Sequence, residues 1–63
     1  MKHCYLKENE RTKTLLKKNP SWWRILRKGK PEEMNKAWSY DVESYDGKIR
    51  AWVLAEDIKN ESS

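Results

Sequence analysis

Few side chains in this chain are of the types that carry out catalysis, and those present lack the partners that a reaction needs. His3 and Cys4 are adjacent, which would pair a base with a thiol nucleophile. No third residue is placed to orient them, and two ligands are too few for a structural metal site. Asp41 and Glu43 have the spacing of a carboxylate pair, but we expect both on the water-exposed face of a strand, whereas acid–base catalysis needs a partly dry site. The sequence therefore predicts that the protein is not an enzyme and uses no metal or cofactor.

Tryptophan, arginine and lysine are the residue types that instead indicate a function. The stretch "NPSWWRILRKG", residues 19–29, places two adjacent tryptophans among two arginines and a lysine. Tryptophan and arginine are the residues that most often anchor protein interfaces, and lysine and arginine neutralise the phosphates of nucleic acids. The stretch therefore predicts contact with another macromolecule.

Charge is distributed unevenly along the chain. Residues 1–30 contain ten Lys/Arg and two Glu, a balance of +8, whereas residues 31–63 contain four Lys/Arg and eight Asp/Glu, a balance of −4. One interpretation is a partner that is a nucleic acid or an acidic protein surface. The other is that the two halves attract each other, either within one chain or across a homodimer. The sequence leaves both interpretations open.

The length and the cysteine content limit what the fold can be. A chain of 63 residues forms one domain, and a domain of about this size buries only about 60% of the surface of its unfolded chain. A single cysteine excludes an internal disulfide and indicates a reducing compartment. No apolar run is long enough for a signal peptide or a membrane span, so we expect a cytoplasmic protein that does not contact a membrane.

Helix signals are concentrated in the first half of the chain. Asn9 is placed to cap a helix that would run from about residue 10 to residue 18. In the tryptophan-containing stretch, Asn19 suits an N-cap, Pro20 the first helical position and Gly29 the position after the last turn. Pro31 leads into a further helical first turn. The sequence therefore predicts that residues 5–37 form a helical, basic part.

On a helix over residues 19–29, the apolar and basic side chains would occupy opposite faces. Trp22 and Trp23 are four and three residues from Leu26, so these three residues would share an apolar face. Arg24 and Arg27, followed by Lys28, would form a basic stripe on the other side. We therefore expect the tryptophans in the core and the basic stripe in contact with a partner.

The period of the pattern changes to two after residue 37. The segment "WSYDVE" alternates apolar and polar residues, and Asp46-Gly47 suits a two-residue type I′ turn. Folding the chain there predicts a β-hairpin over residues 38–54 with these pairs: Val42 with Ala51, Tyr40 with Val53, and Glu43 with Arg50. Because Met34, Trp38, Val42 and Tyr45 are three or four residues apart, a helix over residues 31–45 is the alternative.

Trp52 and Leu54 would lie on the otherwise polar face of this hairpin. They would form either a contact surface or an area that the preceding helices cover. The predicted fold class is α+β, in which two or three short N-terminal helices pack on a C-terminal β-hairpin. We expect a single domain over residues 1–63 with a mobile tail at 59–63. The predicted core consists of Leu15, Leu16, Trp22, Trp23, Leu26, Tyr40 and Val53.

About half of the chain carries a motif that is similar to a known family. The matching residues are Tyr5, Leu6, Asn9, Leu15, Leu16, Pro20, Trp22, Trp23, Arg24, Leu26, Arg27 and Pro31. With this pattern, residues 5–38 resemble the YlbE-like family of small bacterial proteins. The chain departs from the family in a small insertion at "RKGKPEE" and in its alternation past Trp38, where the family reads as helical. The resemblance implies an N-terminal helical module and no chemistry.

The leading prediction is a small accessory or regulatory protein, bacterial or phage-encoded, that docks on a larger protein partner. A recombination directionality factor and a modulator of a host enzyme are examples of such proteins. The alternative is a small basic DNA-binding protein of winged-helix-like layout, contacting nucleic acid directly. The short helix offers no exposed Asn or Gln to contact adenine, and the acidic second half would repel DNA. The predicted partner-binding residues are Arg24, Arg27, Lys28, Lys30, Trp52 and Leu54.

Overall fold

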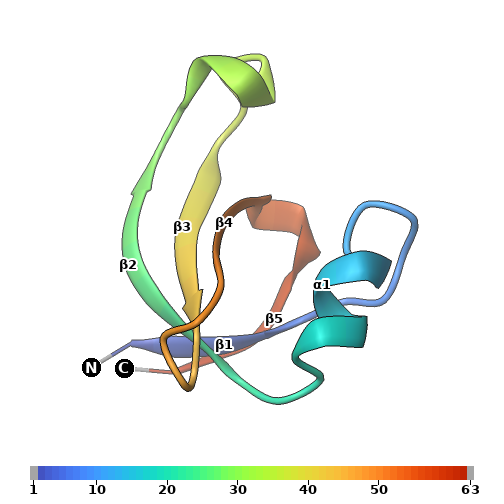
Figure 1. Cartoon of the computed structure of the whole chain (residues 1–63). Coiled ribbons are helices and arrows are strands. Elements are labelled where there is room, and N and C mark those ends of the chain that lie inside the picture. Colours follow the sequence, from blue (N-terminus) through green and yellow to red (C-terminus); the bar gives the residue numbers. More distant parts are fainter. Residues whose placement is uncertain (1, 63) are drawn as a thin grey trace.

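Figure 1 shows a computed structural model of the protein, which describes residues 2–62. Within these residues the chain forms five strands, one α-helix and two short 3-10 helices. In chain order they are β1 (His3–Leu6), α1 (Lys13–Lys18), β2 (Trp23–Gly29), η1 (Glu32–Met34), β3 (Ser39–Ser44), β4 (Arg50–Leu54), η2 (Ala55–Asp57) and β5 (Ile58–Ser62). All neighbouring strands are antiparallel and belong to one sheet in the order β4-β3-β2-β1-β5.

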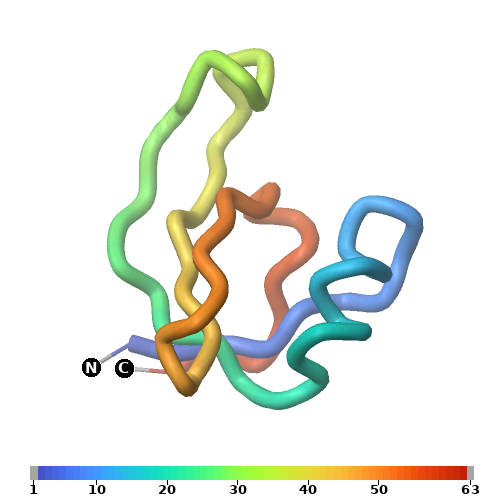
Figure 2. Tube along the Cα trace, viewed as in Figure 1, coloured from blue at the N-terminus to red at the C-terminus, as the bar shows by residue number. Residues whose placement is uncertain are grey.

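The sheet curls because its two outermost strands are consecutive in the chain. β4 and β5 lie at opposite ends of the strand order, yet only the single turn of η2 joins them. Four residue steps span at most about 14 Å, so these two strands must approach each other where η2 connects them. Figure 2 shows the last segment of the chain returning alongside the first, where β5 pairs with β1. The result is a partly open, barrel-like sheet.

The core lies on the concave side of this curled sheet. Its fully buried apolar residues come from β1, β2, β3 and β4: Cys4, Leu6, Trp23, Val42 and Val53. Partly buried residues pack around them: Leu15, Leu16, Ile25, Tyr40, Ile49 and Ile58. Trp23 is the largest fully buried side chain. The helix α1 contributes the two leucines and lies to one side of the sheet (Figure 1).

The predicted α+β fold of helices packed on a hairpin is wrong, and the stretch from 19 to 29 shows why. Asn19 ends α1, because its backbone is extended (φ −146°, ψ 95°), although its N–H still donates to the carbonyl of Leu15 at 2.8 Å. Its Oδ1 accepts the N–H of Ser21 at 3.2 Å, so the side chain holds a turn instead of starting a helix. The chain then runs as β2, which pairs with β1 on one side and β3 on the other. Pairing with these distant segments outweighs the local cap signals.

Helix within residues 5–37 is therefore limited to α1 and the single turn η1. Asn9 does organise the approach to α1, since its Oδ1 accepts the N–H groups of Arg11 at 2.8 Å and Thr12 at 3.1 Å. These bonds close a turn over residues 9–12, and the helix begins at Lys13 instead of residue 10. Pro31 precedes η1, so the predicted helical first turn forms but does not continue.

The hairpin prediction is confirmed in its register, and the alternative helix over residues 31–45 is wrong. β3 and β4 pair Val42 with Ala51, Tyr40 with Val53 and Glu43 with Arg50. The turn differs from the prediction. The Ser44 N–H donates to the carbonyl of Ile49 at 2.8 Å, which leaves a four-residue loop over residues 45–48. In this loop the Gly47 N–H donates to the carbonyl of Ser44, and only Gly47 has a positive φ. A type I′ turn needs two such residues.

The predicted mobile tail is wrong for the residues that the structure describes. Residues 58–62 form β5, which pairs along β1, while Ser63 lies outside the described residues. Ile58 packs against the core and Tyr5 pairs with Lys59. The polar sequence "KNESS" therefore serves as an outermost strand. No helix within residues 2–62 has the length and apolar character to cross a membrane.

Ion pairs join the basic half of the chain to the acidic half. Arg11 contacts Asp57 at 2.9 Å and Glu56 at 3.5 Å, and Arg24 pairs with Glu43. Arg27 of β2 also pairs with Asp41 of β3, at 3.1 Å. Attraction between the halves within one chain therefore accounts for part of the uneven charge.

Candidate functional site

The structure divides the six predicted partner-binding residues between two surfaces. Arg24 is in register with Glu43, and Arg27 with Asp41, on the convex face of β2, β3 and β4. Trp52 lies in the row of Asp41 on this face, whereas Leu54 pairs with Ser39 at the end of β4 and lines a hollow beside Trp38. Lys28 instead pairs with Tyr40, whose row belongs to the opposite, concave face, and Lys30 follows at the end of β2.

The first surface surrounds Trp38, which precedes β3. Its side chain is the most exposed large apolar one among residues 2–62, at 56%. Two open hollows of about 370 and 320 Å³ meet at Trp38. Their lining residues, which we call the Trp38 groove, are Lys28, Ala37, Trp38, Tyr40, Leu54, Ala55 and Glu56. The N–H of Ala55 donates to the carbonyl of Trp38 at 3.0 Å, so η2 fixes the backbone of the groove.

Two lysines lie over the aromatic rings of this groove. Lys30 Nζ is 4.7 Å from the ring centroid of Trp38, and Lys28 Nζ is 5.8 Å from that of Tyr40. The Tyr40 hydroxyl donates to Glu61 at 3.1 Å, and partial burial followed by this bond raises the pKa of Tyr40. Cations at these distances are attracted to the faces of the rings. The hollow of Lys28 and Tyr40 therefore offers aromatic surface with two lysines beside it, whereas Glu56 lines the other hollow.

The second surface is the convex face of β2, β3 and β4, which we call the arginine face. It consists of Arg24, Arg27, Asp41, Glu43, Arg50 and Trp52. Asp41 accepts hydrogen bonds from Arg27 Nε at 3.1 Å and from Arg50 Nε and NH2 at 3.1 and 2.7 Å. The bonds from Arg50, and after them that from Arg27, lower the pKa of Asp41. Arg27 also lies over the Trp52 ring, 5.4 Å from its centroid.

Two residues of the predicted core are not part of the core. Trp22 lies on the convex face, where its ring is 5.7 Å from that of His3 and 5.9 Å from that of Tyr45. Leu26 is exposed at the point where the β2–β3 register shifts by one residue. Both expectations rested on helical spacing, whereas neighbouring residues of a strand point to opposite faces. Trp23 and Val53 are buried as predicted, with Leu15, Leu16 and Tyr40 partly buried around them.

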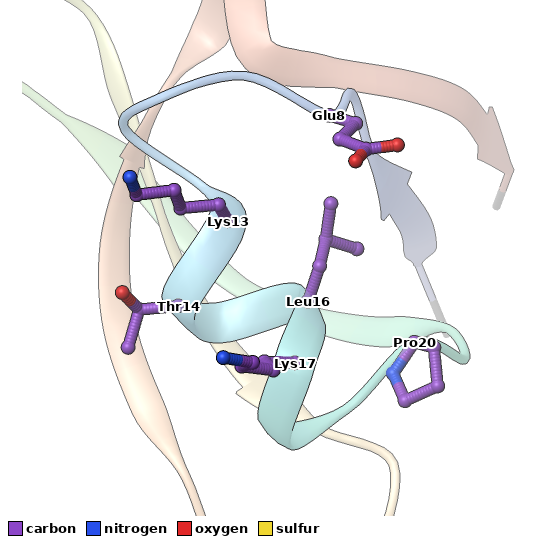
Figure 3. Close-up of a pocket in the computed structure, with 6 residues that line it drawn as sticks. All are labelled: Glu8, Lys13, Thr14, Leu16, Lys17 and Pro20. Atoms are coloured by element: carbon purple, nitrogen blue, oxygen red, sulfur yellow. The ribbon is translucent and has the colours of Figure 1, made fainter.

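A third hollow lies beside α1 and has a volume of about 560 Å³. It is lined by Glu8, Lys13, Thr14, Leu16, Lys17 and Pro20. In Figure 3, Leu16 is the apolar side chain between the loop at Glu8 and Pro20, while the two lysines lie along the helix. Lys13 also pairs with Glu10 at 2.8 Å. With flexible charged chains and no aromatic ring, this hollow lacks the aromatic anchors that the Trp38 groove offers.

His3 and Cys4 are not brought together as a reactive pair. The side chain of His3 packs on Trp22 on the convex face, whereas Cys4 is fully buried in the core. Burial, followed by the negative charge of Glu61, raises the pKa of the Cys4 thiol to about 11. A thiol in this environment is inert.

Comparison with known proteins yields no family, curated protein or solved structure that matches this chain. The resemblance over residues 5–38 therefore stays a prediction. The strand structure of β1 and β2 contradicts the helical module that it implied.

Sequence reasoning missed the role of Trp38, because the alternating pattern assigned it to the buried face of the hairpin. Trp38 directly follows the charged loop over residues 30–37. This position was the available signal that the strand begins at Ser39 and not at Trp38. Asp41 was likewise expected on the open face, whereas its side chain is only 3% exposed. The charge-assisted hydrogen bonds from Arg27 and Arg50 make the burial of this carboxylate possible.

Proposed function

We propose that this protein is a small non-enzymatic accessory protein whose Trp38 groove binds an extended segment of a larger protein partner. The observation that carries the proposal is the exposed Trp38 ring at the meeting point of two hollows. Tryptophan is a frequent anchor of binding energy, and an exposed ring that lines hollows offers a partner an apolar contact.

The shape and charge of the groove indicate the chemistry of its occupant. Two shallow hollows that share one ring suit two side chains of one extended segment, as in other aromatic-lined peptide grooves. An apolar side chain would pack between Trp38 and Tyr40. Lys28 and Lys30 would then favour an acidic residue beside it. We therefore propose a partner segment that combines apolar and acidic side chains.

The winged-helix-like DNA-binding alternative is wrong in its layout. The basic stretch that would have been its recognition helix is the strand β2, and two of its cations, Arg24 and Arg27, pair with Glu43 and Asp41. These carboxylates offset the positive charge that would meet phosphates. Protein docking is the function that the geometry supports better.

The experiment is a selection from a displayed peptide library on the purified protein, followed by affinity measurement of the selected peptides. We expect Trp38→Ala to weaken binding by about 30-fold or more, the loss typical of an anchoring residue. The free energy of unfolding should change by only about 0.5 kcal/mol, because Trp38 is exposed.

The matched control is Tyr45→Ala, since Tyr45 is a similarly exposed aromatic at 50% but lies outside the groove. Its affinity should match that of the unaltered protein. Equal losses in both variants, or unchanged affinity in Trp38→Ala, would contradict the proposal.

A further inference from the structure

Asp41 is unusual because its carboxylate lies on the convex face of the sheet and is nevertheless almost fully buried. Its side chain is 3% exposed, and the cover comes from Arg27, Arg50 and the neighbouring Trp52. A buried carboxylate requires hydrogen bonds and an opposite charge. The Asp41 carboxylate accepts three charge-assisted hydrogen bonds, which suffice to stabilise it as a buried structural group.

The two arginines have more binding capacity than Asp41 uses. Each guanidinium carries five N–H donors in a planar fork. Arg27 donates to Asp41 through Nε, and Arg50 through Nε and NH2. Their side chains remain 67% and 59% exposed. The outer N–H groups of both guanidinium groups therefore face solvent, while their inner edges are held in place.

A comparison within the same chain shows that a buried aspartate can be stabilised by one arginine instead of two. Arg11 forms the same kind of contact with the buried Asp57, through Nε at 3.0 Å and NH2 at 2.9 Å. There the third hydrogen bond comes from a neutral donor, the Asn9 amide at 2.8 Å, and one guanidinium faces the buried carboxylate, with Glu56 nearby at 3.5 Å. Asp41 instead holds two guanidinium groups, which leaves a local charge of +1. Structural satisfaction of a buried aspartate does not require this second cation.

The sheet geometry brings the second arginine into place. A β-bulge at Leu26 sets two residues of β2 against one of β3, so Arg27 shares the convex face with Asp41. Without the bulge, strand alternation would direct position 27 to the opposite face. The Trp52 ring beneath Arg27 further restricts its guanidinium. The two arginines are thus preorganised, which reduces the entropy lost on binding.

We propose that the Arg27–Asp41–Arg50 cluster, flanked by Trp52, is a second binding site that takes a carboxylate from an acidic segment of a protein partner. A planar guanidinium edge matches a carboxylate in bidentate geometry. In the neighbouring Arg24–Glu43 pair, the Glu43 carboxylate offsets the charge of Arg24, which disfavours a row of phosphates but tolerates one carboxylate. Trp52 offers apolar surface beside it. This site goes beyond the Trp38 groove and does not depend on it.

The test uses an acetylated and amidated hexaglutamate peptide, with hexaglutamine as the neutral control. Titration is followed through the Nε–Hε resonances of Arg27 and Arg50 in the isotope-labelled protein. We expect hexaglutamate to shift both resonances and hexaglutamine to shift neither. The double variant Arg27→Lys/Arg50→Lys keeps the charge but loses the planar forks, so its affinity should fall about tenfold. Arg11→Lys, the matched control, should bind as the unaltered protein does.

Three results would overturn the proposal. The first is hexaglutamate binding that leaves both arginine resonances of the unaltered protein unmoved, which stays decisive even if the double variant does not fold. The second is full affinity in a folded double variant, because any cation would then suffice. The third is a short DNA duplex that shifts these resonances at lower concentration than hexaglutamate, which would assign the site to phosphates. All three leave the Trp38 groove untouched, since Trp38→Ala tests it separately.

Discussion

Trp22 and Trp23 are adjacent in the chain but lie in opposite environments. Trp23 is fully buried in the core, whereas Trp22 lies on the convex face against His3 and Tyr45. Strand alternation produces this difference, and the helical interpretation of the same stretch treated both tryptophans alike. Burial of a large aromatic ring is worth several kcal/mol, so the two positions should differ in stability.

We therefore predict that Trp23→Ala lowers the free energy of unfolding by about 3–5 kcal/mol, enough to unfold much of so small a domain. Trp22→Ala should cost roughly 1 kcal/mol, because only a partly exposed aromatic cluster is lost. Urea denaturation followed by circular dichroism measures both values. Similar losses at the two positions would contradict the assignment of Trp22 to the convex face.

Cys4 provides a second test at the scale of single residues. Its thiol is fully buried, and its pKa is raised to about 11, so little thiolate forms at pH 8. We predict that a thiol reagent labels the native protein only as fast as the fold opens, and labels the urea-unfolded chain at once. Rapid labelling of the native protein would mean that β1 does not occupy the core.

At the scale of elements, local and distant pairing differ in how far the sequence reveals them. The β3–β4 hairpin was predictable in register, since its alternation and its turn lie within about 15 residues of one another. β2 was not, because longer segments separate it from its partners: α1 and its loops lie between β1 and β2, and the loop with η1 lies between β2 and β3. The residue types at Asn19 and Gly29 are also those that begin and end a helix, so they favoured a helix over residues 19–29. Local helix propensity is outweighed when a segment pairs with a strand on each side, as β2 does with β1 and β3.

The two glycines of the chain allow a matched test of the hairpin. Gly47 has a φ of +77°, whereas a Cβ at Gly29 would meet only the Trp52 side chain at 3.7 Å, an ordinary contact. Gly47→Ala should lower the free energy of unfolding by about 1–2 kcal/mol, the cost of the left-handed region for an L-residue. Gly29→Ala should be neutral or slightly stabilising. Thermal denaturation of both variants decides, and equal melting temperatures would argue against the four-residue turn.

The candidate sites were only partly predictable for a related reason. The types of residue were recognisable, since Arg24, Arg27 and Trp52 were all expected to meet a partner. The separation of the six predicted partner-binding residues into a groove and an arginine face depends on the bulge at Leu26 and on η2, which brings Ala55 to Trp38. Neither feature has a strong local signature in the sequence. The uneven charge was visible, but which carboxylate meets which arginine required the fold.

At the scale of the whole molecule, ion pairs tie distant segments together and make stability depend on pH. Hydrogen bonds from Arg11, and after them from Asn9, lower the pKa of Asp57, and Arg50 and Arg27 do the same for Asp41. A carboxyl whose pKa is lower in the folded chain than in the unfolded chain stabilises the fold fully above the unfolded value of about 3.9. This contribution is lost as the pH falls through the lower, folded value.

We predict that the melting temperature is nearly constant from pH 7 to about pH 5 and falls steeply below about pH 4. Asp57→Asn removes one of the responsible groups, so it should lower stability at pH 7 by roughly 1–3 kcal/mol and flatten the decline in acid. Calorimetry at several pH values measures both effects. An unchanged acid decline in Asp57→Asn would show that the Arg11 contact does not form in solution.

Docking at the Trp38 groove is the central claim, and chemical-shift mapping with a library-selected peptide tests it most directly. Two-dimensional ¹H–¹⁵N spectra would be recorded during titration, including the indole N–H of Trp38. We predict that the largest shifts fall on the residues of the Trp38 groove, with the Trp38 indole among them. Largest shifts around Lys13, Leu16 and Lys17, the hollow beside α1, would contradict the account and move the docking site to the helix.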